Sequence, residues 1–190
     1  LRRKTGFAFF TPPVGNRAQP ELNHSLLLAA KNPPPPLLYA DTERFADPLY
    51  FGKVGVPDAF VACQLGKKKV AVVSALEFGR VKRTSDFDLV LPLERYLQRA
   101  RELWPQRRPG GAEVIFLLAK EYGQTRFTVG EGFPSGIYEK LFELGLDLEV
   151  ADGALFPQRE LKTPAEAAAI AAGNACSAAG LAAAERLLKA

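Results

Sequence analysis

Four consecutive prolines at positions 33 to 36 divide this sequence into two parts of different character. Each proline fixes its own φ angle and lacks an amide donor, so the run can form neither a helix nor a central strand. Three further prolines occur in the first twenty residues. Residues 1–36 are therefore predicted to be an irregular, proline-rich leader, and a compact fold must be built from the residues that follow.

The residues after the prolines carry the pattern of an α/β domain. Two apolar runs, residues 60–65 and 70–73, flank a basic loop that contains glycine, and they predict a β-hairpin. Residues 114–118 are continuously apolar, which is typical of a strand covered on both faces. Further strands are predicted at residues 37–40, 87–91, 126–129 and 146–150.

Two helices are predicted between these strands. Residues 93–104 place their apolar side chains on one face at helical spacing, and residues 135–144 repeat that pattern. Gly145 follows as the expected left-handed cap. The alternation of strands and helices, together with the hairpin, predicts an α/β fold with a mixed β-sheet flanked by helices.

A long alanine-rich helix is predicted at the end of the sequence. Thr163, Pro164 and Glu166 form a capping box with proline at the first helical position. No stop signal precedes Ala190, so we expect the chain to end partway into a further domain. Residues 167–184 lack charge over 18 positions, long enough for a membrane span, but their alanines contribute little to insertion. We therefore expect a soluble helix and no membrane partner.

The composition excludes several kinds of active site. His24 is the single histidine, so a Ser-His-Asp triad would need it, and a multi-histidine metal site is impossible. Cys63 and Cys176 make no disulfide framework, which favours a reducing, cytoplasmic location. The net charge is only +4 and the basic clusters are scattered, so no nucleic-acid partner is expected. No catalytic or metal-binding residue is predicted in this chain.

The segment from Gly130 to Gly136 imitates a dinucleotide-binding turn, because it lies between a predicted strand and a predicted helix. Ser135 replaces the third glycine of that motif, and Pro134 removes an amide donor from the phosphate cradle. The favoured interpretation is a connector. A free-standing α/β module that binds a small molecule or nucleotide remains the alternative.

Two short motifs resemble the N-terminal domain of the creatinase, prolidase and aminopeptidase P family, the pita-bread metallopeptidases. Residues 46–52 followed by residues 56–60 are similar to the family's aspartate-Tyr-aromatic-Thr-Gly stretch, although the threonine is absent here. Residues 159–166 resemble the family's Arg-x-x-Lys-Ser/Thr-x-x-Glu junction, which leads into the catalytic domain.

The resemblance implies a three-layer sandwich with a ribonuclease H-like motif. It implies a creatinase N-terminal-like domain over residues 37–158, and a junction with the first helix of a catalytic domain over residues 159–190. In relatives this domain is non-catalytic, mediates subunit contact in a homodimer and helps to wall the active site. The parent would be a metallopeptidase that cleaves Xaa-Pro peptides with two divalent ions (Mn, Co or Zn) held downstream. An inactive or creatinase-like homologue is a further alternative.

The resemblance also suggests particular residues. Tyr50, Phe51 and Asp58 are expected in a loop that would face an active site formed by the next domain or subunit, although both rings could equally pack under the hairpin. The junction motif itself places Arg159, Lys162, Thr163 and Glu166 at the domain boundary.

Overall fold

A computed structural model describes residues 33–189 of the chain. In chain order its elements are β1 (Leu37–Ala40), α2 (Ala46–Gly52), β2 (Phe60–Leu65), β3 (Lys68–Val73), α3 (Ala75–Thr84), β4 (Leu89–Pro92), α4 (Leu93–Leu103), α5 (Gly111–Glu121), β5 (Arg126–Val129), α6 (Ser135–Glu143), β6 (Asp147–Val150), the 3-10 helix η1 (Pro157–Glu160) and α7 (Pro164–Lys189).

The strands form a mixed sheet. Strand β2 runs antiparallel to β1 and β3, and β3 pairs with β4 in parallel. Strands β5 and β6 pair in parallel as a second, two-stranded unit. A bridge between Pro36 and Thr128 places β5 beside the start of β1, and the Thr128 amide donates to the Pro35 carbonyl at 2.9 Å. Consequently every strand except β2 points in the same direction.

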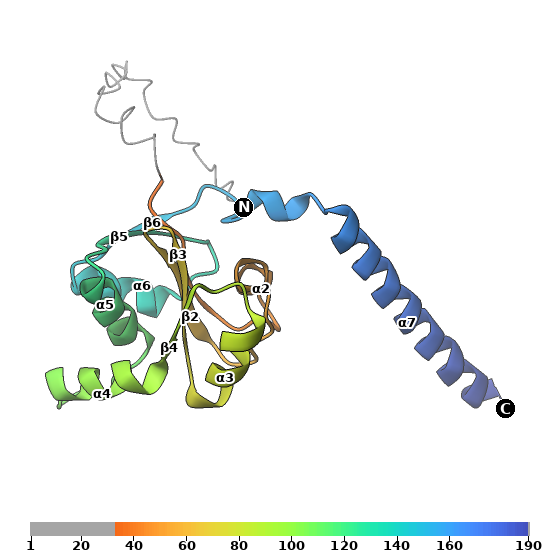
Figure 1. Ribbon diagram of the computed structural model, residues 1–190, viewed down its shortest axis with the longest axis horizontal. Helices are drawn as coiled ribbons and strands as arrows, with labels where there is room; N and C mark the ends of the chain where they lie inside the picture. Colours follow the sequence, from red (N-terminus) through yellow and green to blue (C-terminus); the bar gives the residue numbers. More distant parts are fainter. Residues whose placement is uncertain (1–32, 190) are drawn as a thin grey trace, which may run out of the picture. The chain divides into compact units, whose positions relative to one another are not determined.

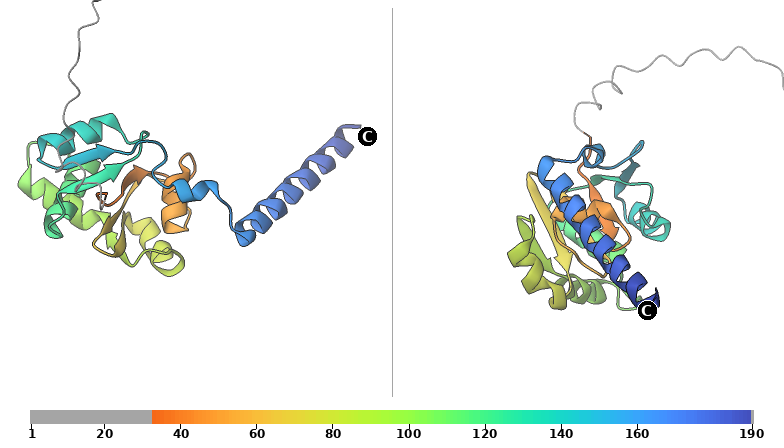
Figure 2. Two further views of the ribbon diagram at one scale, coloured as in Figure 1. Left: turned by 90° about the horizontal axis from the view of Figure 1, so that it is seen from above. Right: turned by 90° about the vertical axis from the view of Figure 1, so that its right-hand side faces the viewer.

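Side chains that alternate along the strands pack into two separate hydrophobic cores, one on each face of the sheet. Val61 and Cys63 of β2 face the core beneath α4, α5 and α6, whereas Ala62 faces the core beneath α2 and α3. On β3, Val72 and Ala71 divide between the two cores in the same way. The helix groups lie on opposite sides of the sheet (Figures 1 and 2). The predicted mixed sheet between two helical layers is confirmed.

Helix α5 corrects one prediction. Residues 114–118 form the middle of this helix rather than a strand. The helix is buried on almost every side, so its apolar run lacks the periodicity of a helix with one wet face. The Glu113 carboxylate accepts a hydrogen bond from the Gly110 amide at 2.8 Å, so a capping interaction marks where the helix begins.

Two further helices were not predicted. Residues 46–52 form α2, so the expectation that Tyr50 and Phe51 lie in a loop is wrong. Residues 75–84 form α3. Its apolar side chains are few and lie among charged ones, so the sequence shows no clear helical periodicity there. The hairpin, the two predicted helices and strands β1, β4, β5 and β6 are confirmed, within a residue or two at their ends. Gly145 has the expected positive φ of 90°.

Helix α7 begins at the predicted capping box. The Glu166 amide donates to the Thr163 hydroxyl at 3.2 Å, and the Thr163 amide donates to the Glu166 carboxylate at 3.0 Å. None of the described residues of the helix is buried. Length and composition alone would allow this helix to cross a membrane, which is weak evidence for such a role.

Candidate functional site

The junction motif lies against helix α2, and the two segments form the candidate site. The Arg159 guanidinium on η1 pairs with the Asp47 carboxylate on α2 at 2.9 Å. The Lys53 ammonium, at the end of α2, pairs with the Glu166 carboxylate in the first turn of α7 at 3.3 Å. Two ion pairs therefore join α2 to the predicted junction, one on each side of residues 161–163.

Lys53 is placed unusually for a residue with a side chain. It caps α2 in the left-handed region with φ 52°, a position that normally favours glycine. Its ammonium lies 4.4 Å from the centre of the Tyr50 ring, so Tyr50 and Glu166 both contact the same cation. The lysine thus makes contacts that glycine could not replace, which offsets the backbone strain of its position.

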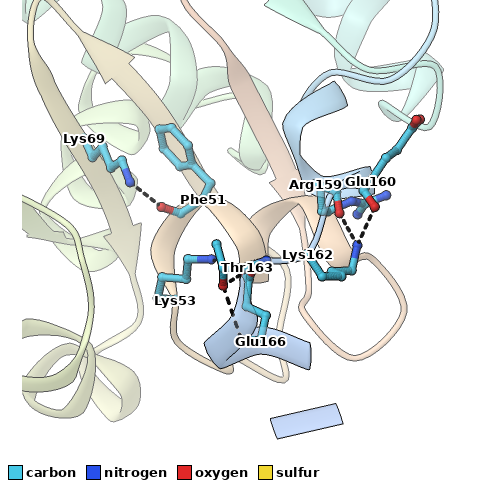
Figure 3. A network of polar contacts seen from close by, with 8 residues as sticks. All are labelled: Phe51, Lys53, Lys69, Arg159, Glu160, Lys162, Thr163 and Glu166. Atoms are coloured by element: carbon cyan, nitrogen blue, oxygen red, sulfur yellow. Dashed lines mark hydrogen bonds and ion pairs between the residues drawn. The ribbon is translucent and has the colours of Figure 1, made fainter. Parts of the chain in front are cut away.

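The capping box adds a third interaction to the junction. The pKa of Glu166 is lowered to about 2 because the Thr163 amide and hydroxyl donate to its carboxylate, with a smaller contribution from Lys53. Its carboxylate therefore stays charged at neutral pH and connects the helix start to α2 (Figure 3). Lys162 turns back instead onto the carbonyl of Arg159, within its own segment.

Aromatic contacts lie beneath these ion pairs. Phe156, just before η1, stacks on the Phe51 ring with 5.5 Å between centroids and contacts the Tyr50 ring at 5.7 Å. Phe51 is buried in the core that also holds Phe60, whereas Tyr50 stays half-exposed. Of the two rings expected at a site wall, only Tyr50 remains available at the surface.

A shallow recess of about 290 Å³ opens over this junction. Its wall consists of three α2 residues together with the paired side chains: Ala46, Leu49, Tyr50, Lys53, Arg159 and Glu166. Leu49 is an exposed large apolar side chain in this wall. The recess combines an aromatic ring, an aliphatic side chain and compensated charges, which suits contact with another folded surface.

The sequence-predicted site residues are only partly brought together. Tyr50 shares the recess with Arg159 and Glu166, and Thr163 supports it through the capping box. Asp58 instead lies at a separate cavity on the carboxyl side of the sheet. His24 lies outside the described residues.

The recess offers ion pairs and apolar contacts. Across residues 33–189, no group of three or more His, Cys, Asp or Glu side chains could hold a metal ion. The resemblance places the two divalent ions in a downstream domain, so no reaction step is derived through them here. What the site offers is a pair of salt bridges, each between partly exposed groups.

The turn that imitates a nucleotide motif is largely exposed, with side chains beside two of its glycines. The Asp47 carboxylate and the Leu155 side chain approach the position that a Gly130 Cβ would occupy, at 4.0 Å and 3.8 Å. The Phe45 ring lies 3.6 Å from the equivalent position at Gly132. The Asp47 carboxylate is paired with Arg159, and Pro134 supplies no amide donor to the turn, so the connector interpretation remains the favoured one.

Sequence reasoning missed three contributors to the junction. Asp47 and Lys53 lie within the matched family stretch, but nothing in their spacing predicts their partners more than a hundred residues away. Phe156 precedes Pro157, and an aromatic residue in a proline-containing linker could have signalled that the linker packs against the domain.

No family model and no curated protein sequence matches this chain. Solved structures do. The X-Pro aminopeptidase of Thermotoga maritima superposes with a TM-score of 0.53 at 11% identity, over 76% of this chain and 37% of that chain. The prolidase of Pyrococcus horikoshii superposes with a TM-score of 0.50 at 14% identity, over 74% and 35%. The chain has the fold of the prolidase and aminopeptidase P N-terminal domain.

The fold expected from the two family motifs is therefore confirmed. The chain spans little more than a third of the length of the two structures that it matches. At such low identity the prolidase-like N-terminal fold is what is shared, and activity does not follow from it.

Proposed function

We propose that this chain is the non-catalytic N-terminal domain of a metal-dependent Xaa-Pro aminopeptidase or dipeptidase. The observation that supports this most is the position of the junction motif in the aminopeptidase P N-terminal fold. Arg159 and Glu166 tie the start of α7 to α2 through Asp47 and Lys53. A segment held in this way can set the orientation of a following domain.

In this proposal the chemistry belongs to residues outside the described chain. Two divalent ions (Mn, Co or Zn) in the downstream domain would activate a water molecule and polarise the scissile carbonyl of the peptide. The described residues contribute surface. Tyr50, Leu49 and the ion pairs of the recess provide a wall against the catalytic domain or a second subunit.

The same proposal includes the partners of the parent protein and its location in the cell. The parent protein would be a cytoplasmic homodimer that acts on peptides and binds neither nucleic acid nor membrane. The buried, reduced Cys63 and the alanine-rich composition of α7 agree with this environment.

The experiment is a hydrolysis assay of the full-length gene product that carries this domain. With Mn²⁺, Co²⁺ or Zn²⁺ supplied, it should release the N-terminal residue from Xaa-Pro peptides and spare matched Xaa-Ala peptides. A chelator should abolish the release, and the metal should restore it. A protein that binds the metals but cleaves neither peptide would leave an inactive homologue, and cleavage that resists chelation would favour creatinase-like chemistry.

A second assay tests the role of the junction. In the full-length protein, Arg159→Gln should lower the turnover number because the catalytic domain is positioned less well. Arg126→Gln removes a similarly placed exposed ion pair on β5, with Asp147, and should leave turnover unchanged. Equal effects of the two substitutions would mean that the junction pair does not position the catalytic domain.

A further inference from the structure

A cavity of about 320 Å³ with no part in the junction lies at the carboxyl ends of the parallel strands. It lies where β1 and β3 end and where α3, α4 and α5 begin, and it includes Tyr39, Ser74 and Leu93. Ligands of open α/β sheets commonly bind at this edge. The volume is at the lower end of the range for small-molecule pockets, which begins at roughly 300 Å³.

The walls of the cavity are mostly apolar. Val56 and Val114 are buried, and Leu93 and Leu97 at the start of α4 are partly buried around the same space. These aliphatic side chains would hold a compact apolar group and exclude water from around it.

Three polar side chains line the cavity, those of Tyr39, Ser74 and Asp58, and the Ser74 hydroxyl makes no capping hydrogen bond. Ser74 occupies the N-cap of α3 without a side-chain capping hydrogen bond, and the Glu94 carboxylate accepts from the Ala75 amide in the first turn at 2.9 Å. Because a hydroxyl accepts as well as donates, each of the three groups can accept a hydrogen bond from a ligand in the cavity.

The charges around the cavity select the sign of that ligand. Asp58 is exposed at the cavity, and the buried Glu77 carboxylate lies in its wall, paired with Arg80 on the solvent side. The start of α5, which could attract an anion, is already capped by the Glu113 carboxylate. The Asp58 and Glu77 carboxylates repel an anion and favour a cation, and the Glu113 cap weakens the attraction of an anion to the start of α5.

We propose that this cavity binds a primary ammonium group carried on a small apolar body. The apolar body packs against Leu93, Leu97 and Val114, and the ammonium donates to Asp58 with the Tyr39 and Ser74 hydroxyls in reach. Free arylalkyl amines and the N-terminal residue of an apolar peptide share this chemistry. The cavity has no wall residue in common with the junction recess, so this inference goes beyond the proposed function and is tested separately.

The test is a titration of the chain with phenethylammonium, followed by calorimetry and by backbone amide NMR shifts. Binding should saturate and should shift amides of residues 58–61, 74–77 and 110–114. The neutral 2-phenylethanol should bind more weakly by up to about fivefold, since a partly exposed ion pair contributes up to about 1 kcal/mol. The anionic 3-phenylpropionate should bind most weakly. The N-terminally free dipeptide Phe-Gly amide, compared with its N-acetylated form, then distinguishes a peptide end from a free amine.

Substitutions at the cavity test whether the ligand binds there. Asp58→Asn should weaken phenethylammonium binding about fivefold, whereas Asp152→Asn, an exposed carboxylate away from the cavity, should not change it. Ala59→Trp fills the mouth from an exposed position and should abolish the shifts without disturbing the core. Absence of saturable binding, equal binding of the alcohol, tighter binding of the anion, or binding that survives Ala59→Trp would each overturn the proposal.

Discussion

The Asp47 carboxylate and the Arg159 guanidinium form an ion pair at 2.9 Å that joins α2 to the 3-10 helix before α7. Both side chains are about two-thirds covered, which limits the screening of their attraction by solvent. Phe156 stacks on Phe51 directly below them. The linker is therefore held onto the domain by both polar and aromatic contacts.

A double-mutant cycle should measure this attachment. We expect Asp47→Asn and Arg159→Gln to show a coupling of about 0.5 kcal/mol in the free energy of unfolding, measured by urea denaturation. The cycle removes the separate effect of Asp47 on the first turn of α2. The more exposed pair of Arg126 with Asp147 is the matched control and should couple more weakly. Coupling no larger than in the control would contradict the attachment.

The start of α7 should depend on pH through Glu166. The folded-state pKa of Glu166 is lowered to about 2 from an ordinary value of 4.5, so its stabilising effect is complete above pH 4.5. That effect is lost as the pH falls from about 4.5 through about 2. We expect the amide of Glu166 to lose protection from hydrogen exchange over this window. Thr163→Ala should move the Glu166 pKa upwards in a carboxylate NMR titration, and an unchanged pKa would contradict the capping box.

Replacing Gly52 and Gly136 by alanine should change the stability of the fold in opposite directions. A Cβ at Gly52 would overlap the Phe87 ring, which packs between Phe51 and Phe60, so Gly52→Ala should destabilise by about 1–3 kcal/mol. Gly136 lies within α6 and has nothing within 4 Å of an added Cβ. Gly136→Ala should stabilise by up to about 1 kcal/mol through helix propensity. Thermal unfolding of both variants decides, and equal melting temperatures would show that Phe87 does not pack as described.

The two cysteines should differ in reactivity. Burial raises the pKa of the Cys63 thiol to about 12, whereas Cys176 is exposed on α7. Because the thiolate is the reactive form, a disulfide reagent at pH 8 should label one thiol per native chain and two in denaturant. Rapid labelling of both thiols in the native protein would mean that strand β2 is not in the core.

The sequence predicts the hairpin, the amphipathic α4 and the start of α7 because each carries a local signal. The sequence does not predict helix α5 because the helix is buried around most of its surface. Its apolar run therefore matches a covered strand as well as a helix. The sequence does not predict helix α2 because this seven-residue element contains Pro48 and aromatic residues, which give little helical pattern. Pairs such as Asp47 with Arg159 depend on tertiary proximity, and no spacing rule predicts them.

The candidate site was predictable in part for the same reason. The junction residues Arg159, Thr163 and Glu166 were found because they form one short motif with its own capping chemistry. The α2 surface that contacts these residues was not predicted, since it exists only once α2 has folded. Asp58 was grouped with Tyr50 by sequence proximity, but residues 53–57 turn the chain so that Asp58 reaches the far cavity.

The metal content of the protein distinguishes a catalytic domain downstream from a metal site in the described residues. We propose that the two divalent ions are held downstream, since no group of three or more His, Cys, Asp or Glu side chains among residues 33–189 could hold a metal ion. After equilibration with Mn²⁺ and removal of free ions, elemental analysis should find two ions per full-length gene product. The same treatment of the 190-residue chain should find none. Tightly bound Mn²⁺ in the 190-residue chain, or none in the full-length product, would contradict the account.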